Sequence, residues 1–131
     1  MKVMISQPMK DREEVDIKKE RQQIVEKFNK MHIEVIDTLF TEEAPKDCNV
    51  ALYYLGKSID AMKDIDALYM CENWSDNRGC RIEKEVAKEY GIKILDKSFF
   101  SNDKYYNQVT IKGTDILLTN NNGIRSGECI K

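Results

Sequence analysis

Short apolar runs, rich in β-branched residues, alternate with stretches in which apolar residues recur at helical spacing over the first 95 residues of the chain. Such alternation is typical of βαβ units, in which parallel strands form a sheet and helices cover its faces. The pattern predicts strands over 2–6, 33–37, 67–71 and 92–95. We therefore expect an α/β fold with a flavodoxin-like or Rossmann-like parallel sheet and flanking helices.

The segments between these strands are predicted to be helices. Asp11, followed by Glu14 three residues later, resembles an acidic capping box that would open the first helix. Gly91 is a suitable cap for the carboxyl end of the last helix. Helical spacing predicts two buried stripes: Ile17, Ile24, Phe28 and Met31 in the first helix, and Leu52, Leu55, Ile59 and Met62 in a helix over 49–63.

The pattern changes after Asp96. Two β-prone runs, 109–112 and 116–119, are joined through Gly113-Thr114-Asp115, which predicts a β-hairpin. We expect an α/β domain over 1–96 and a β-rich appendage over 97–131 that packs on the same domain or on a partner subunit. The aromatic residues of this appendage either pack the hairpin against the sheet or a subunit, or stack a base; they are Phe99, Phe100, Tyr105 and Tyr106.

Composition narrows the classes of function. The 131 residues fit one domain, and 21 basic and 23 acidic residues are interleaved, giving a net charge of −2. No basic tract indicates a nucleic acid or membrane partner, and no apolar run is long enough for a signal peptide or a membrane span. Cys48, Cys71, Cys80 and Cys129 lie far apart without a C-x-x-C motif, so neither disulfides nor a metal is expected. We expect a cytoplasmic protein without a metal or cofactor.

The most informative single position is Glu83. At about 100° per residue it shares a helical face with Val86, Ala87 and Tyr90, whereas Glu85 points to solvent. A carboxylate on an apolar face costs several kcal/mol unless it is paired or hydrogen-bonded. Glu83 is therefore either a functional carboxylate or a structural ion tied to a Lys, an Arg or a backbone amide.

Candidate ligand-binding residues cluster where the predicted strands end. In an open α/β sheet, small molecules bind outside the carboxyl ends of the strands. That edge carries the turn Ser6-Gln7-Pro8-Met9, then Asp37, and a loop that contains Trp74, Asn77, Arg78 and Gly79. Ser6 either bonds a phosphate oxygen or satisfies the start of the first helix. Trp74 either stacks a base or covers the core.

Several of these segments resemble one family. They are Met4-Ile5-Ser6-Gln7-Pro8-Met9, Glu34-Val35-Ile36-Asp37, Tyr53-Tyr54-Leu55, Asp66-Ala67-Leu68-Tyr69 and Gly79-Cys80-Arg81-Ile82-Glu83-Lys84-Glu85-Val86-Ala87. They resemble the DUF4406 family over about residues 1–96. That family is related to the nucleoside 2-deoxyribosyltransferases and the deoxynucleoside 5′-monophosphate N-hydrolases.

The resemblance implies roles for particular residues. In the transferase-like enzymes, a Gly four residues before a Glu and a small residue four after it mark the nucleophile that attacks the anomeric carbon, and Gly79, Glu83 and Ala87 fit that spacing. Those enzymes carry an Asp where this sequence has Ser58. A hydroxyl is a poor acid or base near neutral pH.

The same resemblance also implies a Tyr in the first strand and an acidic residue at position 77, where this chain has Asn77. The first strand holds no Tyr. The acid–base role would then fall to Asp76, Glu72 or Asp37.

Two functions follow as expectations. The first is a nucleoside or nucleotide N-glycosidase, or a 2-deoxyribosyltransferase-like enzyme, with Glu83 as nucleophile. The alternative is a non-catalytic protein that binds or sequesters a nucleotide or an ADP-ribose-like ligand on the same fold. An interaction module without a ligand has only the aromatic appendage in its favour. The resemblance also implies a homodimer or larger homo-oligomer.

Overall fold

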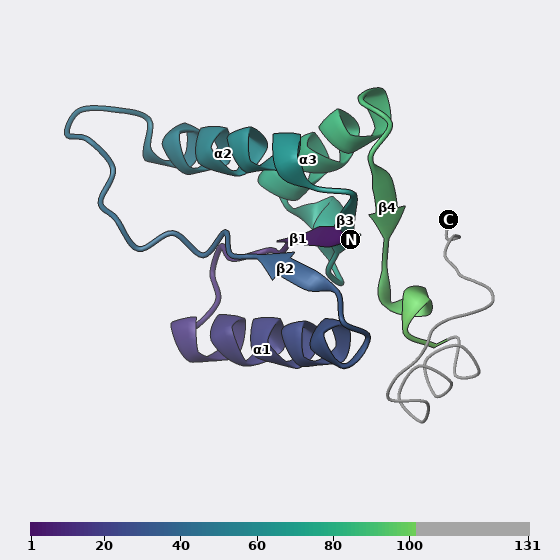
Figure 1. Cartoon of the computed structure of the whole chain (residues 1–131). Coiled ribbons are helices and arrows are strands. Elements are labelled where there is room, and N and C mark those ends of the chain that lie inside the picture. Colours follow the sequence, from purple (N-terminus) through teal and green to yellow (C-terminus); the bar gives the residue numbers. More distant parts are fainter. Residues whose placement is uncertain (102–131) are drawn as a thin grey trace.

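The computed structural model describes residues 1–101 as a sheet of parallel strands with helices on both faces (Figure 1). The strands are β1 (Lys2–Ser6), β2 (Glu34–Ile36), β3 (Ala67–Met70) and β4 (Lys93–Leu95), and the helices are α1 (Glu14–Lys30), α2 (Val50–Ala61) and α3 (Arg78–Glu89). The strand order is β2-β1-β3-β4, and every pairing is parallel. The predicted α/β, Rossmann-like fold is confirmed.

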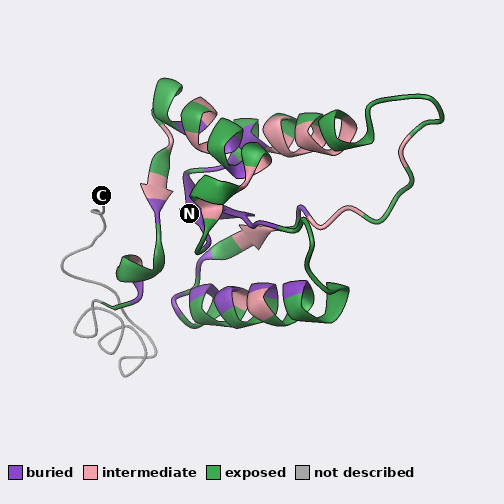
Figure 2. Cartoon of the chain, turned by 180° about the vertical axis from the view of Figure 1, so that it is seen from behind, coloured by how far each residue is buried: buried purple, intermediate pink, exposed green. Residues whose placement is uncertain are grey.

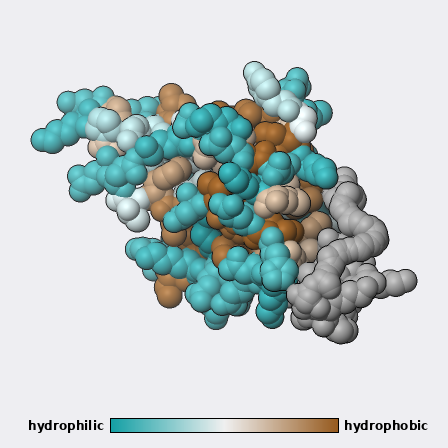
Figure 3. All heavy atoms as spheres, in the orientation of Figure 1, coloured by the Kyte–Doolittle hydropathy of each residue, from teal (hydrophilic) through white to brown (hydrophobic). Residues whose placement is uncertain are grey.

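The sheet separates two apolar layers. α1 covers one face of the sheet, and α2 and α3 lie on the other (Figure 1). Successive side chains of a strand point to opposite faces, so Val3 and Ile5 pack in the α1 layer whereas Met4 packs in the α3 layer. Burial is concentrated on the central strands β1 and β3 and on the helix faces turned toward the sheet, whereas β2 and β4 are mostly exposed or half-buried (Figure 2). In the sphere view, apolar residues gather in the middle of the molecule between hydrophilic ones (Figure 3).

The predicted core stripe of α1 is confirmed, but its predicted cap is wrong. Ile17, Ile24, Phe28 and Met31 are all buried. The helix begins at Glu14, and its N-cap Glu13 forms no side-chain cap hydrogen bond. Asp11 instead adopts a left-handed conformation, with φ of 60°. Asp11 therefore lies in a turn that precedes the helix and cannot be the cap of the predicted box.

The predicted burial of α2 is largely wrong. No residue of α2 is buried, Leu52 is 60% exposed, and Leu55 and Ile59 are only half-buried. Met62, in the short 3-10 helix Met62–Asp64 that follows, is buried as predicted. The reason is position: α2 lies at the outer end of its layer, beside α3, and has less of the sheet beneath it (Figure 1).

The end of α3 confirms one prediction and corrects another. Gly91 has φ of 72°, the left-handed conformation that a glycine adopts at low cost after a helix. Tyr90, predicted to share the buried face of Glu83, is 79% exposed. The helix ends at Glu89, so the helical period no longer determines where Tyr90 points.

The chain beyond β4 adds aromatic residues to the α1 layer. Phe28, Tyr69, Phe99 and Phe100 form a cluster of ring contacts, with centroids 4.8 to 6.0 Å apart. Phe99 and Phe100 therefore pack against the sheet, which was one of the two alternatives; the other was stacking on a base. The predicted hairpin, Tyr105, Tyr106 and Cys129 lie outside the described residues.

Residues 1–101 also show the state of three cysteines, the arrangement of potential metal ligands and the apolarity of the helices. Cys48, Cys71 and Cys80 are free thiols. Within this part of the chain, no group of three His, Cys, Asp or Glu side chains is arranged to hold a metal ion. None of its helices combines the length and apolarity that crossing a membrane requires.

Candidate functional site

A buried contact between α3 and β1 forms the centre of the candidate site. Glu83 is 7% exposed, which confirms that it faces inward, and Glu85 is exposed. Ser6, the last residue of β1, donates a hydrogen bond from Oγ to Glu83 Oε1 at 2.6 Å. Ser6 is fixed in turn by pairing with Met70 of β3. The carboxylate thus lies at the carboxyl ends of the two central strands, where the sequence predicted a ligand site.

Burial dominates the electrostatics of Glu83. Loss of water raises the pKa of Glu83, and the hydroxyls of Ser6 and Ser58 and the charge of Arg21 act in the opposite direction. Ser58, from α2, is therefore close enough to Glu83 to favour its charged form. The structure brings Ser6, Ser58 and Glu83 together from β1, α2 and α3.

This pKa shift predicts a pH-dependent stability difference for Glu83→Gln. Because the folded-state pKa is raised, the folded protein holds the Glu83 proton more tightly than the unfolded chain, and wild-type stability falls as Glu83 ionises with rising pH. The variant has no such proton. Its free energy of unfolding relative to wild type should therefore rise from about pH 4 to about pH 7. Urea titrations at both pH values measure this, with Glu85→Gln as control, and a pH-independent difference would contradict it.

Two buried thiols, Cys71 just after β3 and Cys80 in α3, are poor nucleophiles. Burial raises the pKa of Cys71 to about 12 and that of Cys80 to about 11. Since the thiolate is the reactive form of cysteine, both side chains behave as core residues near neutral pH. Of Cys71, Cys80 and Glu83, the carboxylate is the group suited to attack an electrophilic carbon.

The loop before α3 sets the position of Glu83. Asn77 is the N-cap, and its Oδ1 accepts a hydrogen bond from the Cys80 amide at 2.9 Å. A side chain at Gly79 would meet Asn77 Oδ1 at 3.4 Å and Leu55 Cδ1 at 4.0 Å. The small residue leaves room beside the cap and beside α2. Arg78, the first residue of α3, is exposed.

Removing this cap should lower stability. Asn77→Ala leaves the Cys80 amide without its acceptor, which costs about 1 kcal/mol of unfolding free energy. Asn77→Asp keeps an acceptor at the same place and should retain most of the stability. Urea unfolding of both variants measures the difference, and equal stability of the two would show that the cap contributes little.

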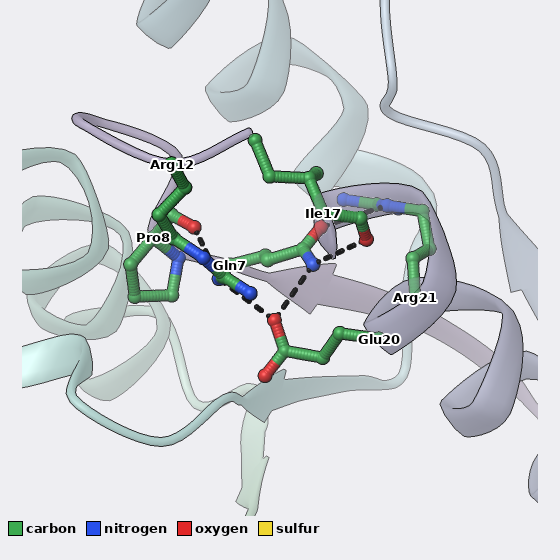
Figure 4. A network of polar contacts seen from close by, with 6 residues as sticks. All are labelled: Gln7, Pro8, Arg12, Ile17, Glu20 and Arg21. Atoms are coloured by element: carbon green, nitrogen blue, oxygen red, sulfur yellow. Dashed lines mark hydrogen bonds and ion pairs between the residues drawn. The ribbon is translucent and has the colours of Figure 1, made fainter. Parts of the chain in front are cut away.

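A polar network ties the turn after β1 to α1 (Figure 4). Gln7 Nε2 donates to the Ile17 carbonyl at 2.9 Å and to Glu20 Oε1 at 2.8 Å. Arg12 Nη1 donates to the Pro8 carbonyl and to the same Glu20 oxygen, both at 2.8 Å. The side chain of Gln7 thus holds the turn in place. The neighbouring Met9 is 37% exposed.

Arg21 is a buried residue that the sequence analysis missed. It is 7% exposed, and its Nε donates to Gln7 Oε1 at 3.1 Å. Desolvation lowers the pKa of Arg21, and nearby negative groups, including Asp37 and Glu83, raise it. The sequence does indicate that Arg21 is buried, since position 21 follows Ile17 by four residues and precedes Ile24 by three, on the same buried stripe.

The other predicted site residues lie apart from Glu83. Asp37 and Asp76 are exposed and neither bonds Glu83; Asp37 Oδ1 accepts from the Leu39 amide. Trp74 packs against the core, with Lys84 Nζ 4.6 Å from its ring centroid. Of the two alternatives for Trp74, the structure favours the cover over the core. A pocket of about 480 Å³ borders it, lined by Met70, Trp74, Lys84, Ile92, Ile94, Leu95 and Asp96.

Comparison with known proteins places the chain in a family. No curated protein and no solved structure matches it. One family model, described as a domain of unknown function (DUF4406), matches residues 1–96. These residues span all four strands, and they include Ser6, Arg21 and Glu83. The chain therefore belongs to the DUF4406 family.

Proposed function

We propose that the protein cleaves the N-glycosidic bond of a nucleoside or nucleotide, as an N-glycosidase or a 2-deoxyribosyltransferase-like enzyme, with Glu83 as nucleophile. The observation that carries the proposal is the state of this carboxylate. Glu83 is buried at the carboxyl ends of the central strands, its direct partner is the Ser6 hydroxyl, and no Lys or Arg within residues 1–101 forms an ion pair with it. A purely structural buried carboxylate is normally paired.

The chemistry fits such a group. Breaking an N-glycosidic bond develops oxocarbenium character at C1′, which a fixed carboxylate can trap. A Glu83 oxygen bonds to C1′ while the bond from C1′ to the base nitrogen breaks, and the base leaves with the electron pair and takes up a proton. Water in a hydrolase, or a second base in a transferase, then displaces Glu83 from C1′. Ser6 orients the attacking carboxylate by holding Oε1.

The departing base needs a proton donor. Ser58 lies near Glu83 but is a weak acid. Three exposed carboxyl groups follow β2 and β3 at this edge of the sheet, Asp37, Glu72 and Asp76, and Glu72 forms an ion pair with Lys97. We assign the acid–base role to Asp37 or Asp76, acting directly or through water, because Lys97 already engages Glu72.

One observation favours a second function. Ser58 stands where the related transferases carry an Asp, so the chain would lack their usual acid–base group. In that case the protein would bind or sequester a nucleotide or an ADP-ribose-like ligand without turning it over. The residues around Glu83 would then serve recognition alone.

We also propose a homodimer or a larger homo-oligomer. α2 is apolar along much of its length, yet none of its residues is buried, and Val50 and Leu52 are 52% and 60% exposed. Apolar surface of this kind is typical of a contact face.

A panel assay tests the proposal. The full chain is incubated with ribonucleosides, 2′-deoxynucleosides and their 5′-monophosphates, and released base is measured by chromatography. The melting temperature is measured with the same panel, because a ligand that binds only the native state raises it. Released base supports the enzyme, and a raised melting temperature without released base supports the binding protein. If no base is released and the melting temperature does not change, both proposals are overturned.

A further inference from the structure

The Arg21 guanidinium is buried with most of its hydrogen-bonding capacity unused. Its Nε donates to Gln7, but neither terminal nitrogen donates to any acceptor within residues 1–101. A buried donor without an acceptor is costly, and a buried charge without a partner is more so. An arginine that is 7% exposed and has no ion pair within residues 1–101 therefore calls for a further partner.

The acidic residues nearest Arg21 do not supply that partner. Glu20, Asp37 and Glu83 are close enough to influence its pKa, yet none forms an ion pair with it. Glu20 accepts from Gln7 and Arg12, Glu83 accepts from Ser6, and Asp37 accepts from a backbone amide. Each carboxylate is thus engaged elsewhere, and the terminal nitrogens of Arg21 remain available.

Thr38 supplies a second, independent observation at the same edge. It is 6% exposed and lies two residues beyond Ile36, the last residue of β2. Its hydroxyl has no hydrogen-bond partner in the described part of the chain. Arg21 interacts electrostatically with Asp37, the residue that precedes Thr38. A buried cation bound to Gln7, just after β1, and a buried hydroxyl just after β2 thus lie beyond the carboxyl ends of two neighbouring strands, both with free donors.

We propose that Arg21 and Thr38 form a subsite for a phosphate group beside Glu83. The planar fork of a guanidinium binds two oxygens of a phosphate in parallel, and a hydroxyl can donate to a third. The inference rests on the proposed function and names its substrate class. The phosphate is either the 5′-phosphate of a nucleotide, which would place C1′ of the same molecule toward Glu83, or free inorganic phosphate.

Binding measurements test the subsite without relying on catalysis. Calorimetric titrations of the full chain use inorganic phosphate, 2′-deoxynucleosides and their 5′-monophosphates. We expect wild type to bind a monophosphate about tenfold or more tightly than its nucleoside, because charge-assisted hydrogen bonds are strong. Arg21→Met should remove this preference and leave nucleoside affinity unchanged. Arg81→Met is the matched control and should keep the preference, since Arg81 is exposed and, among residues 1–101, its side chain bonds a backbone carbonyl alone.

A second variant, Thr38→Val, keeps the inference testable if Arg21→Met fails to fold. Thr38→Val removes the hydroxyl at nearly constant volume and should weaken phosphate binding by several-fold. Arg21→Met removes a buried charge without an ion pair but also leaves the buried Gln7 Oε1 without its donor, so urea unfolding of this variant is measured alongside binding.

The outcomes separate the phosphate sources and the two proposals. Inorganic phosphate that binds and competes with the monophosphate indicates one shared subsite. Binding of inorganic phosphate without any preference for monophosphates assigns the subsite to free phosphate. No phosphate-dependent binding, or a preference unchanged in both variants, overturns the inference. A preference without released base leaves the subsite intact and refutes only the enzymatic proposal.

Discussion

Glu83→Gln is expected to abolish base release, by about 10³-fold or more, while ligand binding stays close to wild type. The amide keeps the shape of the side chain and can still accept the hydrogen bond from Ser6. It cannot form the glycosyl ester, so the covalent step is lost. Turnover by chromatography and affinity by calorimetry, measured on the same preparation, separate these two effects.

Glu85→Gln is the matched control for this variant. It makes the same chemical change two residues away, on an exposed position of α3, and turnover should be unchanged. If Glu83 is instead a structural ion, Glu83→Gln should lower the melting temperature, and activity should fall only in proportion to the folded fraction. Normal turnover in folded Glu83→Gln would rule out the nucleophile assignment.

The largest expected loss of stability comes from Phe28→Ala. Phe28 is fully buried and contacts Tyr69, Phe99 and Phe100, so truncation opens a cavity between α1 and the sheet. Such substitutions cost about 3–5 kcal/mol. Urea unfolding measures the loss. Tyr90→Ala removes an aromatic side chain that is 79% exposed and should cost about 0.5 kcal/mol or less. Similar losses in both variants would contradict this account of the core.

Much of the fold follows from local pattern. β1 lies over the residues predicted for it, and each end of the other strands agrees to within one residue. Buried strands of a parallel sheet are apolar on both faces, which makes them stand out in the sequence. α2 was misjudged because helical spacing shows which residues share a face and does not show whether anything covers that face.

The candidate site was predictable only in part. The inward direction of Glu83 follows from the period of its own helix, and burial confirms it. Its partner Ser6 lies 77 residues earlier in the chain, and local pattern contains no information on which hydroxyl would meet it. Arg21 was missed because a charged residue on a buried stripe is usually assumed to reach solvent. Here its side chain stays at the end of β1, where Gln7 binds it.

The two hydroxyls near Glu83 come from elements that differ in their resistance to local unfolding. Ser6 ends β1, which is hydrogen-bonded to a strand on each side and opens only when the sheet is lost. Ser58 belongs to α2, a helix without a buried residue, and elements with few buried contacts open at low free energy. Transient detachment of α2 would leave Ser6 and Glu83 in place and briefly admit water to the carboxylate. The candidate site is thus bounded by β1, which stays folded with the sheet, and by α2, which opens by local unfolding.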